Sequence, residues 1–229
     1  MYKILEKKVL NPTVVSITVD APFVAKRAKA GQFIILRTDE NGERIPFTIA
    51  GADPEKGTVT VIYQIVGAGT RQLAALEEGD SLHDFAGPLG KPSEIEGENV
   101  AIIGGGVGCA IAYPTAKAFH EAGKNVTSIV GFRNKDLVIL EDEFKEVSDN
   151  YYLMSDDGTA GEKGLVTNKL EELIASGQKF DKVIAIGPLI MMKFVCQLTK
   201  KYDIPTIVSM NPIMIDGTGM CGGCRLMVD

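Results

Sequence analysis

The chain has 229 residues, of which 45% are apolar, and it carries a net charge of −6. This length suits one large or two small domains, each with its own apolar core. The acidic balance argues against nucleic-acid binding, which needs a basic surface. The apolar runs fall short of the roughly 20 residues of a membrane helix. The N-terminus lacks the apolar segment of a signal peptide, so we expect a cytoplasmic protein.

Short β-branched segments run through the first part of the chain. Alternating apolar residues, bounded by Pro, Gly, Asn or Asp, predict strands at 14–19, 32–37 and 58–63. A helical stretch over 70–76 follows them. Several short, closely spaced strands are typical of a small antiparallel barrel. We therefore predict a β-barrel domain over residues 1–97.

Two stretches of this barrel carry groups suited to binding a phosphate. The first is Arg44-Ile-Pro-Phe-Thr48, at the start of a strand, where a guanidinium, a flat ring and a hydroxyl stand close together. An edge strand with an ordinary surface arginine explains the same residues. The second is Val66-Gly-Ala-Gly-Thr70, a glycine turn with Thr70 as the expected cap of the following helix. Gly87-Pro-Leu-Gly90 predicts a turn that closes the domain.

A second glycine turn follows the apolar residues 100–103 and precedes a helical stretch over 110–119. Glycines let the backbone turn sharply and approach a ligand closely. The free N–H groups of the next helix then favour a phosphate. Gly104-Gly-Gly-Val-Gly108 therefore predicts a nucleotide site, although a tight turn in any α/β protein would use the same residues.

The rest of the chain alternates strands and helices. We predict strands at 125–131, 151–155, 182–187 and 205–209, and helices at 141–147, 165–176 and 189–200. This alternation is typical of a doubly wound parallel sheet, here over residues 98–208. Ligands bind at the carboxyl ends of such strands, where Gly104–Gly108, Gly131–Asn134 and Gly187–Pro188 stand. Arg133 and Lys135 either bind a 2′-phosphate or are ordinary surface charges, so NAD and NADP both remain open.

The last segment, residues 209–229, contains Cys221 and Cys224 as C-x-x-C in a glycine-rich loop. In a cytoplasmic chain, cysteines favour metal or redox roles over disulfides. A lone C-x-x-C suits half a zinc site, a redox pair or two ligands of an iron–sulfur cluster.

The order of these motifs resembles the ferredoxin–NADP reductase superfamily over essentially the whole chain. The resemblance implies an N-terminal FAD-binding barrel followed by an NAD(P)-binding α/β domain. It implies that Arg44 binds FAD phosphate, that Phe47, where many members have Tyr, lies against the flavin, and that Gly69 and Thr70 hold the pyrophosphate. Thr48 would be catalytic, near flavin N5. The predicted cofactor-binding residues are Arg44, Pro46, Phe47, Thr48, Ile62, Tyr63, Gly67, Gly69, Thr70, Gly87, Gly104, Gly105, Gly106, Gly108, Arg133, Gly187 and Pro188.

The C-terminal loop has the spacing D-x4-C-x2-C from Asp216, which resembles two groups of that superfamily. Electron-transfer subunits of dihydroorotate dehydrogenase type B have cysteine at the first position. The small subunit of the electron-bifurcating NADH-dependent reduced ferredoxin:NADP⁺ oxidoreductase has aspartate there. The second resemblance implies that Asp216, Cys221 and Cys224 bind a [2Fe–2S] cluster, and that the partner is a larger FAD and iron–sulfur subunit that handles NADP(H) and ferredoxin.

Three ligands are one fewer than such a cluster normally has. Cys109 and Cys196 stand in the nucleotide domain and are poor substitutes. We therefore expect that the chain is truncated; the alternative is an incomplete cluster.

The expected function is an electron-transfer subunit that passes a hydride between NAD(H) and FAD, and single electrons to or from the cluster. One alternative is the dihydroorotate dehydrogenase subunit. The other is a non-catalytic assembly module that binds FAD or zinc.

Overall fold

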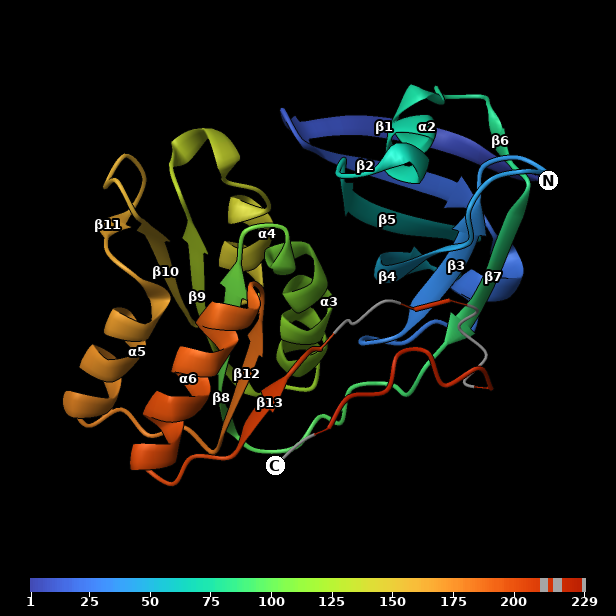
Figure 1. The fold of residues 1–229 in the computed structure, drawn as a ribbon. Helices are drawn as coiled ribbons and strands as arrows, with labels where there is room; N and C mark the ends of the chain where they lie inside the picture. Colours follow the sequence, from blue (N-terminus) through green and yellow to red (C-terminus); the bar gives the residue numbers. More distant parts are fainter. Residues whose placement is uncertain (211–213, 216–219, 228–229) are drawn as a thin grey trace. The chain divides into compact units, whose positions relative to one another are not determined.

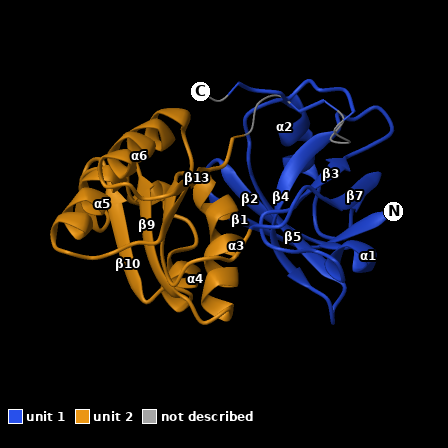
Figure 2. Cartoon of the chain, turned by 90° about the horizontal axis from the view of Figure 1, so that it is seen from below, with its two compact units in different colours: residues 1–93, 211–229 blue, residues 94–210 orange. Residues whose placement is uncertain are grey.

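A computed structural model describes residues 1–210, 214–215 and 220–227. The chain divides into two compact units (Figure 2): unit 1 is residues 1–93 with 211–229, and unit 2 is residues 94–210. The functions that we assign to the sequence ranges 1–97, 98–208 and 209–229 stay predictions. Within the described ranges, no helix combines the length and apolarity that crossing a membrane requires.

Unit 1 is built on a seven-stranded antiparallel sheet with the order β6-β1-β2-β5-β4-β3-β7 (Figure 1). Only His83 separates the two edge strands, β6 and β7, and its backbone N–H donates to the Arg37 carbonyl at 3.0 Å. The sheet therefore curls into a near-closed barrel, as predicted. The elements are β1 (Tyr2–Asn11), β2 (Val14–Asp20), α1 (Pro22–Ala25), β3 (Phe33–Arg37), β4 (Ile45–Asp53), β5 (Thr58–Gln64), α2 (Ala68–Ala75), β6 (Ser81–Leu82) and β7 (Asp84–Leu89).

The barrel core follows the alternation of the predicted strands. Val15, Ile17 and Val19 of β2 point inward, and the β5 residues Val61 and Tyr63 do the same. The sequence missed β1, because its charged side chains leave few buried positions and therefore no alternating apolar pattern. The predicted turn at 87–90 is wrong in part, because β7 continues through Leu89.

Unit 2 is the predicted doubly wound fold, with a six-stranded parallel sheet in the order β11-β10-β9-β8-β12-β13. Figure 1 shows α3 and α4 on one face of this sheet and α5 and α6 on the other. The elements are β8 (Asn99–Gly105), α3 (Gly108–Glu121), β9 (Asn125–Phe132), the short 3-10 helix η1 (Lys135–Leu137), α4 (Glu141–Glu146), β10 (Asn150–Ser155), β11 (Glu162–Lys163), α5 (Val166–Ala175), β12 (Lys182–Ile186), α6 (Leu189–Lys201) and β13 (Thr206–Val208).

The strand order reverses at β8. The chain runs outward from β8 through β9 to β10, and then returns to place β12 on the other side of β8. In open α/β sheets, ligands bind outside the carboxyl ends of the strands at such a reversal. The fold therefore points to the ends of β8 and β12 as the place to look for a site.

Candidate functional site

The first candidate site lies at the carboxyl ends of β8 and β12, where Ile186 pairs with Gly104. A Cβ added to Gly108 would lie 2.5 Å from the Ile186 carbonyl oxygen and 2.7 Å from the Gly187 Cα. A Cβ on Gly187 would lie 3.1 Å from the Gly105 Cα. The turns after the two strands thus touch backbone to backbone, because Gly105, Gly108 and Gly187 have no side chain to hold them apart. The structure brings the predicted glycines of both turns together.

Side chains from α6 and α3 flank this glycine contact. The Met191 Sδ of α6 lies 2.5 Å from the position of a Cβ on Gly105, and the Cys109 Sγ lies 2.8 Å from that on Gly104. Cys109 is fully buried, which raises the pKa of its thiol. The two sulfur atoms therefore pack against the end of β8 from opposite faces of the sheet. Gly106 has a φ of +55° and its N–H donates to the Gly131 carbonyl at 2.9 Å, which fixes the turn.

The loops after β9 and β10 lie side by side at the same edge of the sheet. The Arg133 carbonyl accepts from the Asp157 N–H at 3.3 Å, and the Lys135 N–H donates to the Thr159 hydroxyl at 2.9 Å. Hydrogen bonds from the Thr159 hydroxyl and N–H lower the pKa of the Asp157 carboxyl. The side chain of Arg133 is exposed. Its contact with a 2′-phosphate stays a prediction.

The second candidate site lies on β4 and α2 of unit 1. Pro46, Phe47 and Thr48 are half-buried on β4 and pair with residues of β3. The Phe47 ring lies 5.5 Å from that of Tyr63, at an angle of 47°. Tyr63 itself is 1% exposed and belongs to the barrel core, whereas Ile62 is half-buried. The core thus supports the Phe47 ring from the β5 side.

Helix α2 begins at a glycine turn. Gly67 is the N-cap residue, and Thr70 stands three positions later inside the helix. The Thr70 hydroxyl accepts from the Val66 and Gly67 N–H groups, both at 2.9 Å, and donates to the Gly67 carbonyl at 3.1 Å. The prediction that Thr70 is the N-cap is therefore wrong in position. Its hydroxyl reaches back from the first turn and ties the glycine turn to the helix.

The first turn of α2 lies against the start of β4. A Cβ on Gly69 would lie 2.6 Å from the Ile45 Cδ1 and 2.7 Å from a carboxylate oxygen of Glu43. The structure thus brings Gly69 close to the residues on both sides of Arg44, which is exposed. Glu43 was not predicted from the sequence, because nothing in its local pattern shows that it meets Gly69, 26 residues further along the chain.

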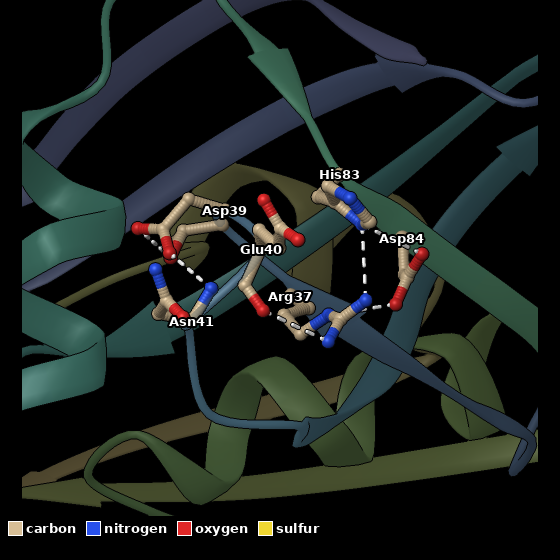
Figure 3. Close-up of polar contacts among 7 residues, drawn as sticks. Arg37, Asp39, Glu40, Asn41, His83 and Asp84 are labelled. Carbon is tan, nitrogen blue, oxygen red and sulfur yellow. Dashed lines mark hydrogen bonds and ion pairs between the residues drawn. The ribbon is translucent and has the colours of Figure 1, made fainter.

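The segment before Arg44 is anchored at the seam of the barrel (Figure 3). The Arg37 Nε lies 2.8 Å from an Asp84 carboxylate oxygen, and its Nη2 lies 3.1 Å from the His83 Nδ1. Burial raises the pKa of Asp84, but the His83 hydrogen bond and the Arg37 charge outweigh it and lower the pKa overall. These contacts join β3 to β7. Gly87 lies further along β7, where a Cβ would meet the Ile34 Cγ2 at 2.7 Å.

The C-terminal segment contains the predicted metal ligands. Cys221 is exposed, Cys224 is half-buried, and both are free thiols. The Gly223 N–H lies 3.4 Å from the Cys221 Sγ. Asp216 lies outside the described residues, and no group of three metal-binding side chains occurs within them. The cluster therefore stays a prediction.

The chain is similar to known proteins over its whole length. Residues 102–197 match the oxidoreductase NAD-binding domain family. A Clostridium beijerinckii protein called an uncharacterized protein in the adh 3′ region is 52% identical over 237 residues, which cover all of this chain and 80% of that protein. A Thermotoga maritima protein named as a homolog of the electron-transfer subunit of dihydroorotate dehydrogenase B (NAD⁺) is 48% identical, with the same coverage of both chains.

A solved structure is similar in both sequence and fold. It comes from work on flavin-based electron bifurcation in the NADH-dependent reduced ferredoxin–NADP oxidoreductase. The two chains are 46% identical with a TM-score of 0.92, and the alignment covers 98% of this chain and 81% of the other.

Proposed function

The chain belongs to the family of dihydroorotate dehydrogenase B electron-transfer subunits and their homologues, an oxidoreductase family with the ferredoxin reductase-like fold, and from this premise we propose that it transfers electrons between NAD(H), FAD and a [2Fe–2S] cluster. The observation that carries this proposal is the backbone contact of Gly105, Gly108 and Gly187 at the strand reversal of an NAD-binding domain. Bound nucleotides need such a close approach of the backbone.

In unit 2, NAD(H) would lie over the turns after β8 and β12. The N-terminus of α3 would face its phosphates, since Gly108 places the first turn of that helix at the strand ends. Arg133 is the residue proposed to meet the far end of the nucleotide. A side chain at Gly105 or Gly187 would clash with the side chain of Met191, which already occupies that space.

In unit 1, FAD would lie along β4 and the first turn of α2. When bound, FAD supplies the chemistry that turns a two-electron hydride into single electrons. Arg44 would bind its phosphates, with Gly69 and Thr70 at the pyrophosphate and Gly67 in the same turn. The Phe47 ring, held by Tyr63, would orient the flavin, and the Thr48 hydroxyl would face N5.

In the C-terminal segment, Cys221 and Cys224 would supply two thiolates to the cluster, with Asp216 as a third ligand. The Gly223 N–H next to the Cys221 sulfur supports this assignment, because hydrogen bonds to ligand sulfurs tune the potential of such clusters. A carboxylate oxygen is a harder ligand than a thiolate. Its presence would shift the potential away from that of an all-cysteine cluster.

We further propose that the partner is a larger FAD and iron–sulfur subunit of an electron-bifurcating ferredoxin:NADP⁺ oxidoreductase. The 46% identity with the bifurcating enzyme and the aspartate at position 216 support this choice. The name of the Thermotoga relative favours a second candidate, a dihydroorotate-oxidising partner. Copurification with a protein that oxidises dihydroorotate would favour this second candidate partner over the bifurcating one.

The test is an anaerobic titration of the purified chain with NADH, followed by visible absorption, with iron and zinc measured on the same sample. The proposal expects a flavin spectrum that NADH bleaches. Thr48→Val, which replaces the hydroxyl with a methyl group and keeps the shape of the side chain, should keep the flavin and slow the bleaching. A flavin that NADH does not reduce would refute the hydride step. Stoichiometric zinc without flavin would instead support an assembly module.

A further inference from the structure

The carboxylate of Glu43 lies where α2 begins. Its Oε2 is 2.7 Å from the ideal Cβ position on Gly69, in the first turn of the helix. That turn has no acidic residue of its own, and the N-cap residue is Gly67. Glu43 thus brings a negative charge from the connection between β3 and β4 to the positive end of the helix.

A hydrogen-bonded turn precedes Glu43 in the chain, and Figure 3 shows its residues Asp39, Glu40 and Asn41 beside Arg37. Between β3 and β4, the Arg37 Nη1 donates to the Glu40 carbonyl at 3.1 Å, and the Asn41 N–H donates to an Asp39 carboxylate oxygen at 2.8 Å. The Gly42 N–H donates to the Asp39 carbonyl at 3.2 Å. Arg37 is itself paired with Asp84 of β7. The segment that leads to Glu43 is therefore tied to the barrel.

We propose that Glu43 is an affinity-determining residue for FAD, because its carboxylate lies beside Gly69, where the proposed function puts the pyrophosphate, and must turn away for FAD to bind. The inference rests on the proposed function, which puts the pyrophosphate at Gly69 and Thr70. A carboxylate and a pyrophosphate are both anionic, so they repel each other when both lie beside Gly69. Arg44, the next residue, attracts the pyrophosphate instead. Glu43 is exposed, so a side-chain rotation suffices to vacate the position.

The test compares the FAD affinities of three full-length chains: the parent, Glu43→Gln and Glu40→Gln. Glutamine keeps the shape of the side chain and removes its charge. Glu40 is the matched control, since it lies in the same turn and its contact with Arg37 uses only the backbone carbonyl. The interaction free energy between a carboxylate and a helix N-terminus is modest. Glu43→Gln removes this interaction and the repulsion of the pyrophosphate, so it should lower the Kd for FAD about two- to fivefold. Glu40→Gln should leave it unchanged.

Two further measurements distinguish repulsion between Glu43 and the FAD pyrophosphate from a general effect of the protein's net charge. Riboflavin has no phosphate, so Glu43→Gln should not improve its binding. The FAD advantage of Glu43→Gln should shrink as the ionic strength rises from about 0.05 to 0.5 M, because salt screens exposed charges.

The possible failures are distinguishable. A parent chain that binds FAD, with a Glu43→Gln variant that binds it equally or more weakly, would overturn this inference and leave the proposed function standing. An equal gain in both variants would also overturn it, because loop charge alone would then explain the effect. A parent chain that binds no FAD would refute the proposed function, and this inference with it.

Discussion

Replacement of Gly108 by alanine sets two physical effects against each other. Gly108 is the first residue of α3, where alanine is intrinsically better than glycine by up to about 1 kcal/mol. The added methyl group would lie 2.5 Å from the Ile186 carbonyl oxygen, and 2.7 and 2.9 Å from the Cα and N atoms of Gly187. All three neighbours are backbone atoms at the end of β12, so no side-chain rotation relieves the clash.

The free-energy cost of the steric clash should exceed the gain in helix propensity. To reach ordinary contact distance, α3 and the end of β12 must separate by roughly 0.5–1 Å, and overpacking of this kind typically costs about 1–3 kcal/mol. With the gain of up to about 1 kcal/mol in helix propensity subtracted, we expect a net loss of stability of up to about 2 kcal/mol. The same displacement opens the strand reversal, so the affinity for NADH should fall as well.

Urea unfolding followed by far-UV circular dichroism measures the first effect, and NADH titration of the folded protein measures the second. Gly106→Ala is the control: its φ of +55° strains an alanine, but among the described residues only the adjoining ones have atoms within 4 Å of the added Cβ. It should lose stability through backbone strain without separating α3 from β12. A Gly108→Ala protein that is as stable as the parent and binds NADH equally well would refute the close-approach argument.

Three other substitutions test single contacts. Thr70→Ala should destabilise unit 1 by about 1–2 kcal/mol in thermal unfolding, because two N–H groups lose their acceptor, and Thr70→Ser should restore most of this. Lys169→Met removes a buried ammonium that bonds to Glu162 at 2.6 Å, at a cost of about 1–3 kcal/mol. The Glu162 hydrogen bond raises the pKa of Lys169, so the parent alone should lose this contribution above about pH 10. Hydrogen bonds from the Asn99 and Glu98 N–H groups lower the pKa of Asp181, so its contribution is present above about pH 4 and lost below it. Asp181→Asn should therefore flatten the acid limb of the stability–pH curve, and an unchanged limb would contradict this.

The sequence by itself determined the parts of the fold that depend on local pattern. The alternation of strands and helices from residue 99 onward predicted the parallel sheet, because each segment shows its own period and its own boundary residues. The short strands β2, β3 and β5 predicted the barrel in the same way. The glycines at 104–108 stood out because so many together are needed only at a sharp turn or a close approach.

Only the tertiary structure decided which distant residues meet. Gly108 touches Gly187 because the strand order places β12 beside β8, a pairing that no local pattern contains. Glu43 meets Gly69 because the barrel brings the start of β4 under the first turn of α2. β1 is a strand because β2 and β6 pair with it, although its own side chains are mostly exposed. Such contacts depend on how the chain returns on itself, whereas sequence periodicity records only which face of each element is buried.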